Sequence, residues 1–122
     1  MSRALNMKTV VLVSLFAVLA GAALVPARRL LAGSTQSLVW SNHMTYDPLD
    51  VKVGDTVTFT WSGKLHDVTS TPSPACGGYT SLYEPTEDGD FSVTFNETGT
   101  FYYACSVGDH CDEGQKITIN VA

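Results

Sequence analysis

Basic side chains are scarce in most of this sequence. From residue 34 onward the only basic residues are Lys52, Lys64 and Lys116, whereas all 12 acidic residues lie in this part of the chain. The segment 34–122 therefore carries a formal charge of −9. Because such a surface repels a phosphate backbone, we exclude nucleic acid as a partner. Any protein partner is expected to dock through a basic face.

Cysteines are few, and their number is odd. The chain has Cys76, Cys105 and Cys111. One disulfide would leave one sulfur over, as a free thiol, an intermolecular partner or a metal ligand. The sequence also lacks internal repeats and low-complexity segments. No apolar tail follows Ala122, so we expect no lipid anchor at that end.

The first residues have the composition of an export signal. Arg3 and Lys8 precede the unbroken apolar and small-residue run Thr9–Val25, which is the layout of a secretory signal peptide. We expect residues 1–33 to be the signal peptide and a short leader, followed by a secreted domain over 34–122. An uncleaved N-terminal membrane anchor is the alternative, because the run is almost long enough to span a bilayer and Arg28 and Arg29 follow it. Either route leads out of the cytosol and permits disulfides.

Alternation with a period of two dominates the rest of the chain and predicts an all-β domain. Apolar and polar residues alternate clearly in four segments, 55–61, 90–96, 100–105 and 116–121. Weaker strands are expected at 37–41, 49–53 and 66–70, and residues 72–89 show no period and are expected to form a long loop. About seven or eight short strands separated by turns indicate a Greek-key β-sandwich or barrel.

Four side chains are expected to meet at one end of this sandwich. Cys105 is in phase with Phe101 and Tyr103, so it points inward where its strand ends. The following loop lets His110 fold back beside it, and Gln115 begins the last strand. His66, just past the strand that ends at Trp61, is the candidate for a fourth group.

These residue types suit copper. A thiolate, two imidazoles and a weak axial ligand make the trigonal site of a blue copper centre. No methionine follows Cys105, so the loop offers no thioether. Gln115 would instead offer an amide oxygen, a harder donor that favours Cu(II) and lowers the reduction potential relative to methionine.

The motif C-x4-H-C-x2-G-Q, formed here from Cys105 to Gln115, resembles the phytocyanins, and within them the stellacyanin type with an axial glutamine. Upstream, residues 51–68 resemble the strand pair of cupredoxins that delivers the first histidine, here His66. The resemblance covers residues 46–121 and implies the cupredoxin fold with one type 1 copper ion. It also implies a Cys76–Cys111 disulfide, which leaves Cys105 as the thiolate.

The expected function is therefore single-electron transfer by Cu(II)/Cu(I) cycling, without enzymatic turnover. Its partner would be a redox protein or a small-molecule electron donor or acceptor, and we expect a monomer. A cupredoxin-fold binding or structural module that holds zinc or no metal is the alternative, since Cys105, His110, Cys111 and His66 nominally form a Cys2His2 zinc set. A third reading is copper storage or delivery. The sequon Asn96-Glu97-Thr98 is a possible N-glycosylation site.

Overall fold

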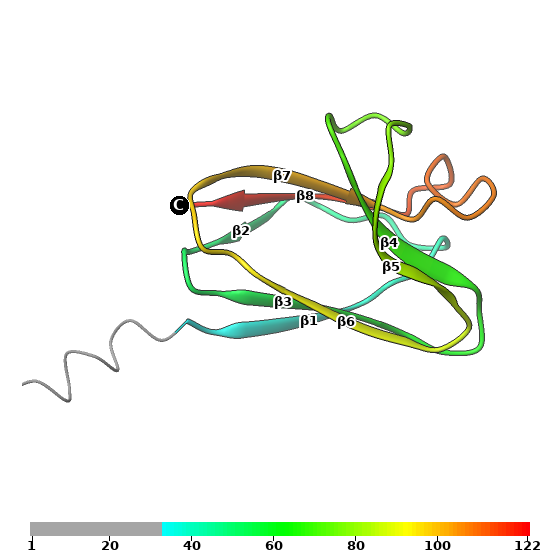
Figure 1. Ribbon diagram of the computed structural model, residues 1–122, viewed down its shortest axis with the longest axis horizontal. Helices are drawn as coiled ribbons and strands as arrows, with labels where there is room; N and C mark the ends of the chain where they lie inside the picture. The colour runs from blue at the N-terminus through cyan, green and yellow to red at the C-terminus, as the bar shows by residue number, and fades with distance from the viewer. Residues whose placement is uncertain (1–32) are drawn as a thin grey trace, which may run out of the picture. The chain divides into compact units, whose positions relative to one another are not determined.

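A computed structural model describes residues 33–122, which form one compact unit. Residues 1–32, which hold the expected signal peptide, lie outside the described residues. In the described part the strands make two sheets that face each other (Figure 1). The eight strands are β1 (Thr35–Val39), β2 (Leu49–Val51), β3 (Thr56–Trp61), β4 (His66–Thr71), β5 (Thr80–Thr86), β6 (Gly89–Thr94), β7 (Gly99–Ala104) and β8 (Lys116–Val121). Within residues 33–122 no helix is long and apolar enough to cross a membrane.

The strand order confirms the expected all-β sandwich. One sheet has the order β1-β3-β6 and the other β2-β8-β7-β4-β5. The outer strands β1 and β2 run parallel to β3 and β8, and the remaining neighbours are antiparallel. Strands β5 and β6, consecutive in sequence, lie in different sheets, so the chain crosses between the layers there.

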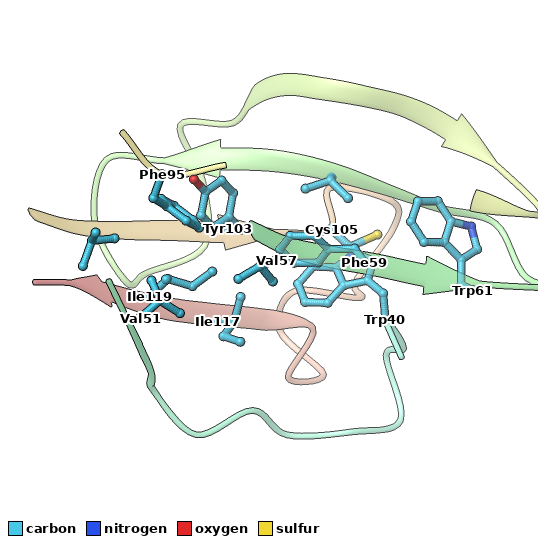
Figure 2. Close-up of a cluster of buried hydrophobic side chains, with 12 residues drawn as sticks. Trp40, Val51, Val57, Phe59, Trp61, Phe95, Tyr103, Cys105, Ile117 and Ile119 are labelled. Carbon is cyan, nitrogen blue, oxygen red and sulfur yellow. The ribbon is translucent and has the colours of Figure 1, made fainter. Parts of the chain in front are cut away.

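The core forms where the alternating apolar faces of the two sheets meet. Val57, Phe59 and Trp61 of β3 are buried, as are Ile117, Ile119 and Val121 of β8. This arrangement is the one that period-two alternation predicts for strands with one apolar face. Aromatic rings fill much of the space, with Phe59 in edge-to-face contact with Trp40 at a centroid distance of 5.0 Å. Figure 2 shows Cys105 drawn with this cluster, to which it belongs.

The prediction of a long loop over residues 72–89 is wrong for its second half, because the chain forms strand β5 there. This strand lies at the edge of its sheet and is largely exposed, so no apolar period marks it. Its register with β4 shifts twice between His66 and Thr69, and Pro85 stands inside it. A proline argues against a central strand but is tolerated in an edge strand. Pro85 and the missing alternation therefore favoured a loop in the sequence, although an edge strand can carry both.

Strand directions bring the candidate ligands to one end of the larger sheet. Strand β4 begins at His66 and pairs antiparallel with β7, so the start of β4 lies near the end of β7. Cys105 directly follows β7, and Gln115 directly precedes the antiparallel β8. The loop between them, which carries His110, therefore closes over the same end.

Candidate metal centre

Three side chains converge as the sequence predicts. The ligand atoms of His66, Cys105 and His110 all lie within 4.8 Å of one another. The two imidazole Nδ1 atoms are 3.2 Å apart. The Cys105 sulfur is 3.5 Å from Nδ1 of His110 and 4.0 Å from Nδ1 of His66.

These separations fit a single metal ion. Atoms bound to one ion at about 2.0–2.3 Å stand roughly 3.3–4 Å apart, the shorter separations in a tetrahedral and the longer in a planar arrangement, so the 3.2 Å between the two Nδ1 atoms is at the short end. Sulfur with two imidazole nitrogens is the donor set of a trigonal copper site. Cys105 is fully buried and His66 is 2% exposed, so solvent has little access to compete for the position between them.

Hydrogen bonds within the loop hold His110 in place. Its backbone N–H donates to the Val107 carbonyl at 3.0 Å, and its carbonyl accepts from Gln115 N–H, also at 3.0 Å. At the base of the loop, Cys105 N–H donates to the Gln115 carbonyl at 3.0 Å. The ligand loop is thus closed by main-chain hydrogen bonds between its own residues.

A disulfide fixes the residue next to His110. Cys76 and Cys111 are bonded, which confirms the expected pairing, and Cys105 is the free cysteine among the described residues. The Cys2His2 zinc set that the sequence left open is not formed, because Cys111 is bonded to Cys76. The bridge ties the ligand loop to the segment that connects β4 with β5.

Gln115 lies beside the three ligands and is fully buried. One end of its amide is 3.2 Å from Nδ1 of His66, and the other end is 3.3 Å from Trp40 Nε1 and from Ser41 N. Both of these donors already have acceptors, since Trp40 Nε1–H donates to the Asp67 carbonyl and Ser41 N–H to the Tyr46 hydroxyl. With its oxygen toward Trp40 and Ser41, the Gln115 amide accepts from both and its NH2 donates to His66; the reversed amide places the oxygen toward the ligand cluster.

Two further residues connect the ligand-bearing segments, and sequence reasoning did not single them out. Asp67 follows His66, and its carboxylate accepts hydrogen bonds from Ser106, which follows Cys105. The signal that was available is the pair of polar residues directly after the two ligands. Their contact depends on the pairing of β4 with β7, which the sequence does not show.

The two ligand histidines differ in their exposure to solvent. His110 is half-buried on its loop, whereas His66 lines a cavity of about 410 Å³ together with Trp61 and Lys64. Both rings direct Nδ1 toward the ligand cluster, so their Nε2 edges point away from it. The remaining histidine, His43, is exposed in the loop after Trp40, as expected, with Nε2 3.4 Å from the Lys64 ammonium.

Burial sets the protonation of the metal-free ligands. It is the main cause that raises the pKa of the Cys105 thiol to about 11, against smaller lowering effects from the Asp67 and Val107 backbone. Burial also lowers the pKa of His66, helped by the nearby His110. At neutral pH the metal-free site therefore holds a protonated thiol and a neutral His66 imidazole.

Most of the described chain matches a known protein family. Residues 35–115 match the plastocyanin-like domain. The chain belongs to the plastocyanin-like family. With its His66, Cys105 and His110 cluster, this cupredoxin has a copper-binding site of the type 1 class.

The relatives confirm the resemblance to phytocyanins. Stellacyanin of Toxicodendron vernicifluum is 29% identical over 85 residues, covering 67% of this cupredoxin and 74% of that protein. The cucumber peeling cupredoxin of Cucumis sativus is 32% identical over 74 residues, covering 57% and 54%. Chemocyanin of Lilium longiflorum is 34% identical over 76 residues, covering 58% and 57%. This cupredoxin thus spans little more than half the length of the cucumber and lily relatives.

Solved structures show the same fold. Cucumber stellacyanin with Cu2+ has a TM-score of 0.50 at 23% identity, covering 74% of this chain and 96% of that one. Spinach plantacyanin has a TM-score of 0.53 at 22% identity, covering 72% and 99%. At such identities the likeness establishes the cupredoxin fold.

Metal uptake should release one proton from this cupredoxin. A metal binds the thiolate, and the pKa of about 11 means that Cys105 is protonated at neutral pH, so binding displaces that proton. Between neutral pH and about pH 11, where the histidine ligands are already neutral, the apparent affinity should therefore rise about tenfold per pH unit. Indicator-dye titration with Zn(II) in weak buffer near pH 8 measures the release. Cys105→Ser is the control that should release none, and zero release by the wild type would contradict a protonated thiol.

Proposed function

We propose that this cupredoxin carries single electrons between redox partners by cycling one copper ion between Cu(II) and Cu(I). The observation that carries the proposal is the cluster of two Nδ1 atoms and one sulfur within 4.8 Å. Cys105 would supply the thiolate, and His66 and His110 would complete the plane of ligands. The copper ion, when bound, supplies the one-electron chemistry.

The protein's own contribution is to keep the ligands in one place in both oxidation states. Cu(I) and Cu(II) prefer different geometries, so a site that cannot rearrange limits the energy spent on each transfer. The buried ligand positions, the closed 105–115 loop and the Cys76–Cys111 bridge all oppose rearrangement. The same rigidity argues against easy copper release, and therefore against a storage role.

Electrons are proposed to enter and leave through His110. This imidazole lies on the loop and is only half-buried, unlike His66. The acidic residues near it in the sequence, Asp109, Asp112 and Glu113, are exposed. A protein partner would then approach with a basic face. A small-molecule electron donor or acceptor could also reach the His110 imidazole. The monomeric state is part of the proposal, as is the absence of substrate turnover.

A visible spectrum of residues 34–122, oxidised to form the disulfide and titrated with Cu(II), tests this function. We expect an intense thiolate-to-copper band that saturates at one copper per chain and is bleached by ascorbate. Cys105→Ser should lose the band, because a hydroxyl cannot replace the thiolate. A colourless copper-loaded wild type that still binds zinc would sink the electron-transfer proposal and support a structural or binding module.

Gln115 is proposed as the axial ligand. Its amide lies 3.2 Å from Nδ1 of His66, and an amide oxygen stabilises Cu(II) more than a thioether does. Replacing it by methionine, Gln115→Met, should raise the reduction potential measured by redox titration. An unchanged potential with an intact visible band would show that Gln115 only fills space beside the copper.

Export of the domain is proposed from the N-terminal composition and the disulfide. A bond between Cys76 and Cys111 persists in oxidising compartments, and the 9–25 run has the properties of a signal peptide. Asn96 is exposed and is proposed as a glycan acceptor. Amino-terminal sequencing and intact mass of the mature protein test both points. A start at Met1 in a membrane fraction would instead support the uncleaved anchor.

A further inference from the structure

A cavity of about 410 Å³ lies beside the first histidine ligand. Trp40 and Trp61 contribute to its wall, and so does Val39, which is 60% exposed. The other lining residues are polar: Ser41, Thr60, Ser62, Lys64 and His66. This volume falls near the lower end of the range for small-molecule sites, which is about 300–1,000 Å³. We call this space the His66 cavity.

The two indole rings have no free N–H group to offer a ligand. Trp61 Nε1–H donates to the Thr86 carbonyl at 2.8 Å. Trp40 Nε1–H donates to the Asp67 carbonyl, also at 2.8 Å. Because both donors are satisfied, the rings act as apolar surfaces, against which the ring of a ligand can pack.

Trp61 is held in one position by its neighbours at the end of β3 (Figure 2). Gly89 is its partner in β6, and a Cβ at that position would overlap the indole ring. Tyr83 contacts the ring at a centroid distance of 5.7 Å and His66 at 6.1 Å, both in edge-to-face geometry. A wall that is already ordered spares a ligand part of the entropic cost of binding.

One positive charge lies at the His66 cavity. Lys64 is one of the three basic residues of the segment 34–122. Within residues 33–122 its ammonium forms no ion pair, and its hydrogen-bonding contact is with His43 Nε2 at 3.4 Å. Asp88 lies at the same turn, where its carboxylate accepts from Gly63 N–H at 3.0 Å, but it does not pair with Lys64. The ammonium is therefore available to an anion.

We propose that the His66 cavity binds a small aromatic carboxylate, with the ring against Trp61 and the carboxylate on Lys64. The ring leaves water for a mostly apolar wall, and the ammonium donates a charge-assisted hydrogen bond. The segment 34–122 carries a formal charge of −9 and repels anions in general, so Lys64 is needed to admit one here.

Binding in this cavity does not require copper. A ligand bound there lies beside His66, one of the two imidazoles of the copper site. It is therefore placed as a small-molecule electron donor or acceptor, and this use of the cavity rests on the electron-transfer function proposed above.

Titration of the metal-free, disulfide-bonded segment 34–122 with benzoate, followed by two-dimensional amide NMR, tests the site. Without metal, the carboxylate has no ion to coordinate. Trp40 and Trp61 are the two tryptophans of the chain, so their indole N–H signals report on the cavity. We expect a saturable shift of the Trp61 signal with a dissociation constant on the order of 1 mM. Benzamide lacks the charge and acetate lacks the ring, so each should bind at least about fivefold more weakly.

Three charge variants locate the anion, all at exposed positions. Lys64→Gln removes the ammonium and should weaken benzoate binding at least about fivefold. Asp88→Asn removes a negative charge from the same turn, keeps an acceptor for the Gly63 N–H, and should tighten binding up to about twofold. Lys52→Gln makes the same change as Lys64→Gln beyond the opposite end of β3, and should change the dissociation constant by less than about twofold.

Absence of a saturable Trp61 shift would overturn the proposal. Equal weakening in Lys64→Gln and Lys52→Gln would also overturn it, because benzoate would then respond to net charge and not to a site. So would shifts centred on the 105–115 loop, which would place the anion elsewhere. Because the titration uses metal-free protein, a failed copper spectrum would refute the electron-transfer function without affecting this result.

Discussion

The pairing of β7 with β8 is the constraint on which the copper site depends. The ladder runs from Gly99 opposite Val121 to Ala104 opposite Lys116, and the hydrogen bond from Cys105 N–H to the Gln115 carbonyl extends it by one step. Because both ends of the 105–115 loop are fixed by this ladder, the loop has few ways to fold. Cys105 and Gln115 are placed by the sheet itself, and only His110 depends on the turns between them.

A disulfide and a pair of part-buried hydrogen bonds connect the 105–115 loop to the rest of the domain. The Cys76–Cys111 bridge joins positions with a sequence separation of 35, and closing a loop of that length is worth about 4 kcal/mol in the chain-entropy account. The Asp67–Ser106 contact makes the second link, between β4 and the first turn of the loop. His66 begins β4 and Cys105 directly follows β7. Their relative position is therefore fixed twice, by the pairing of β4 with β7 and by the Asp67–Ser106 hydrogen bonds.

The ligand set could be predicted from sequence because its spacing is local. Cys105, His110 and Gln115 follow one another within a single loop, and the phase of Phe101 and Tyr103 gives the direction of the cysteine. His66 was found from its position after a clear strand. Asp67 was not found, since its role depends on a contact with Ser106, 39 residues away, and a polar residue after a histidine carries no periodic signal. Strand β5 was missed because neither of its faces is buried enough to leave an alternating pattern.

The irregularity of β5 matters beyond its own sheet. An edge strand offers unpaired main-chain groups on which a strand of another molecule can add, and proteins limit this hazard with proline, charge and broken register. Here Pro85 removes one N–H, the exposed Glu84 and Glu87 place negative charge near it, and the register with β4 is interrupted. The segment that was hardest to recognise from its sequence is therefore also a poor template for edge-to-edge aggregation.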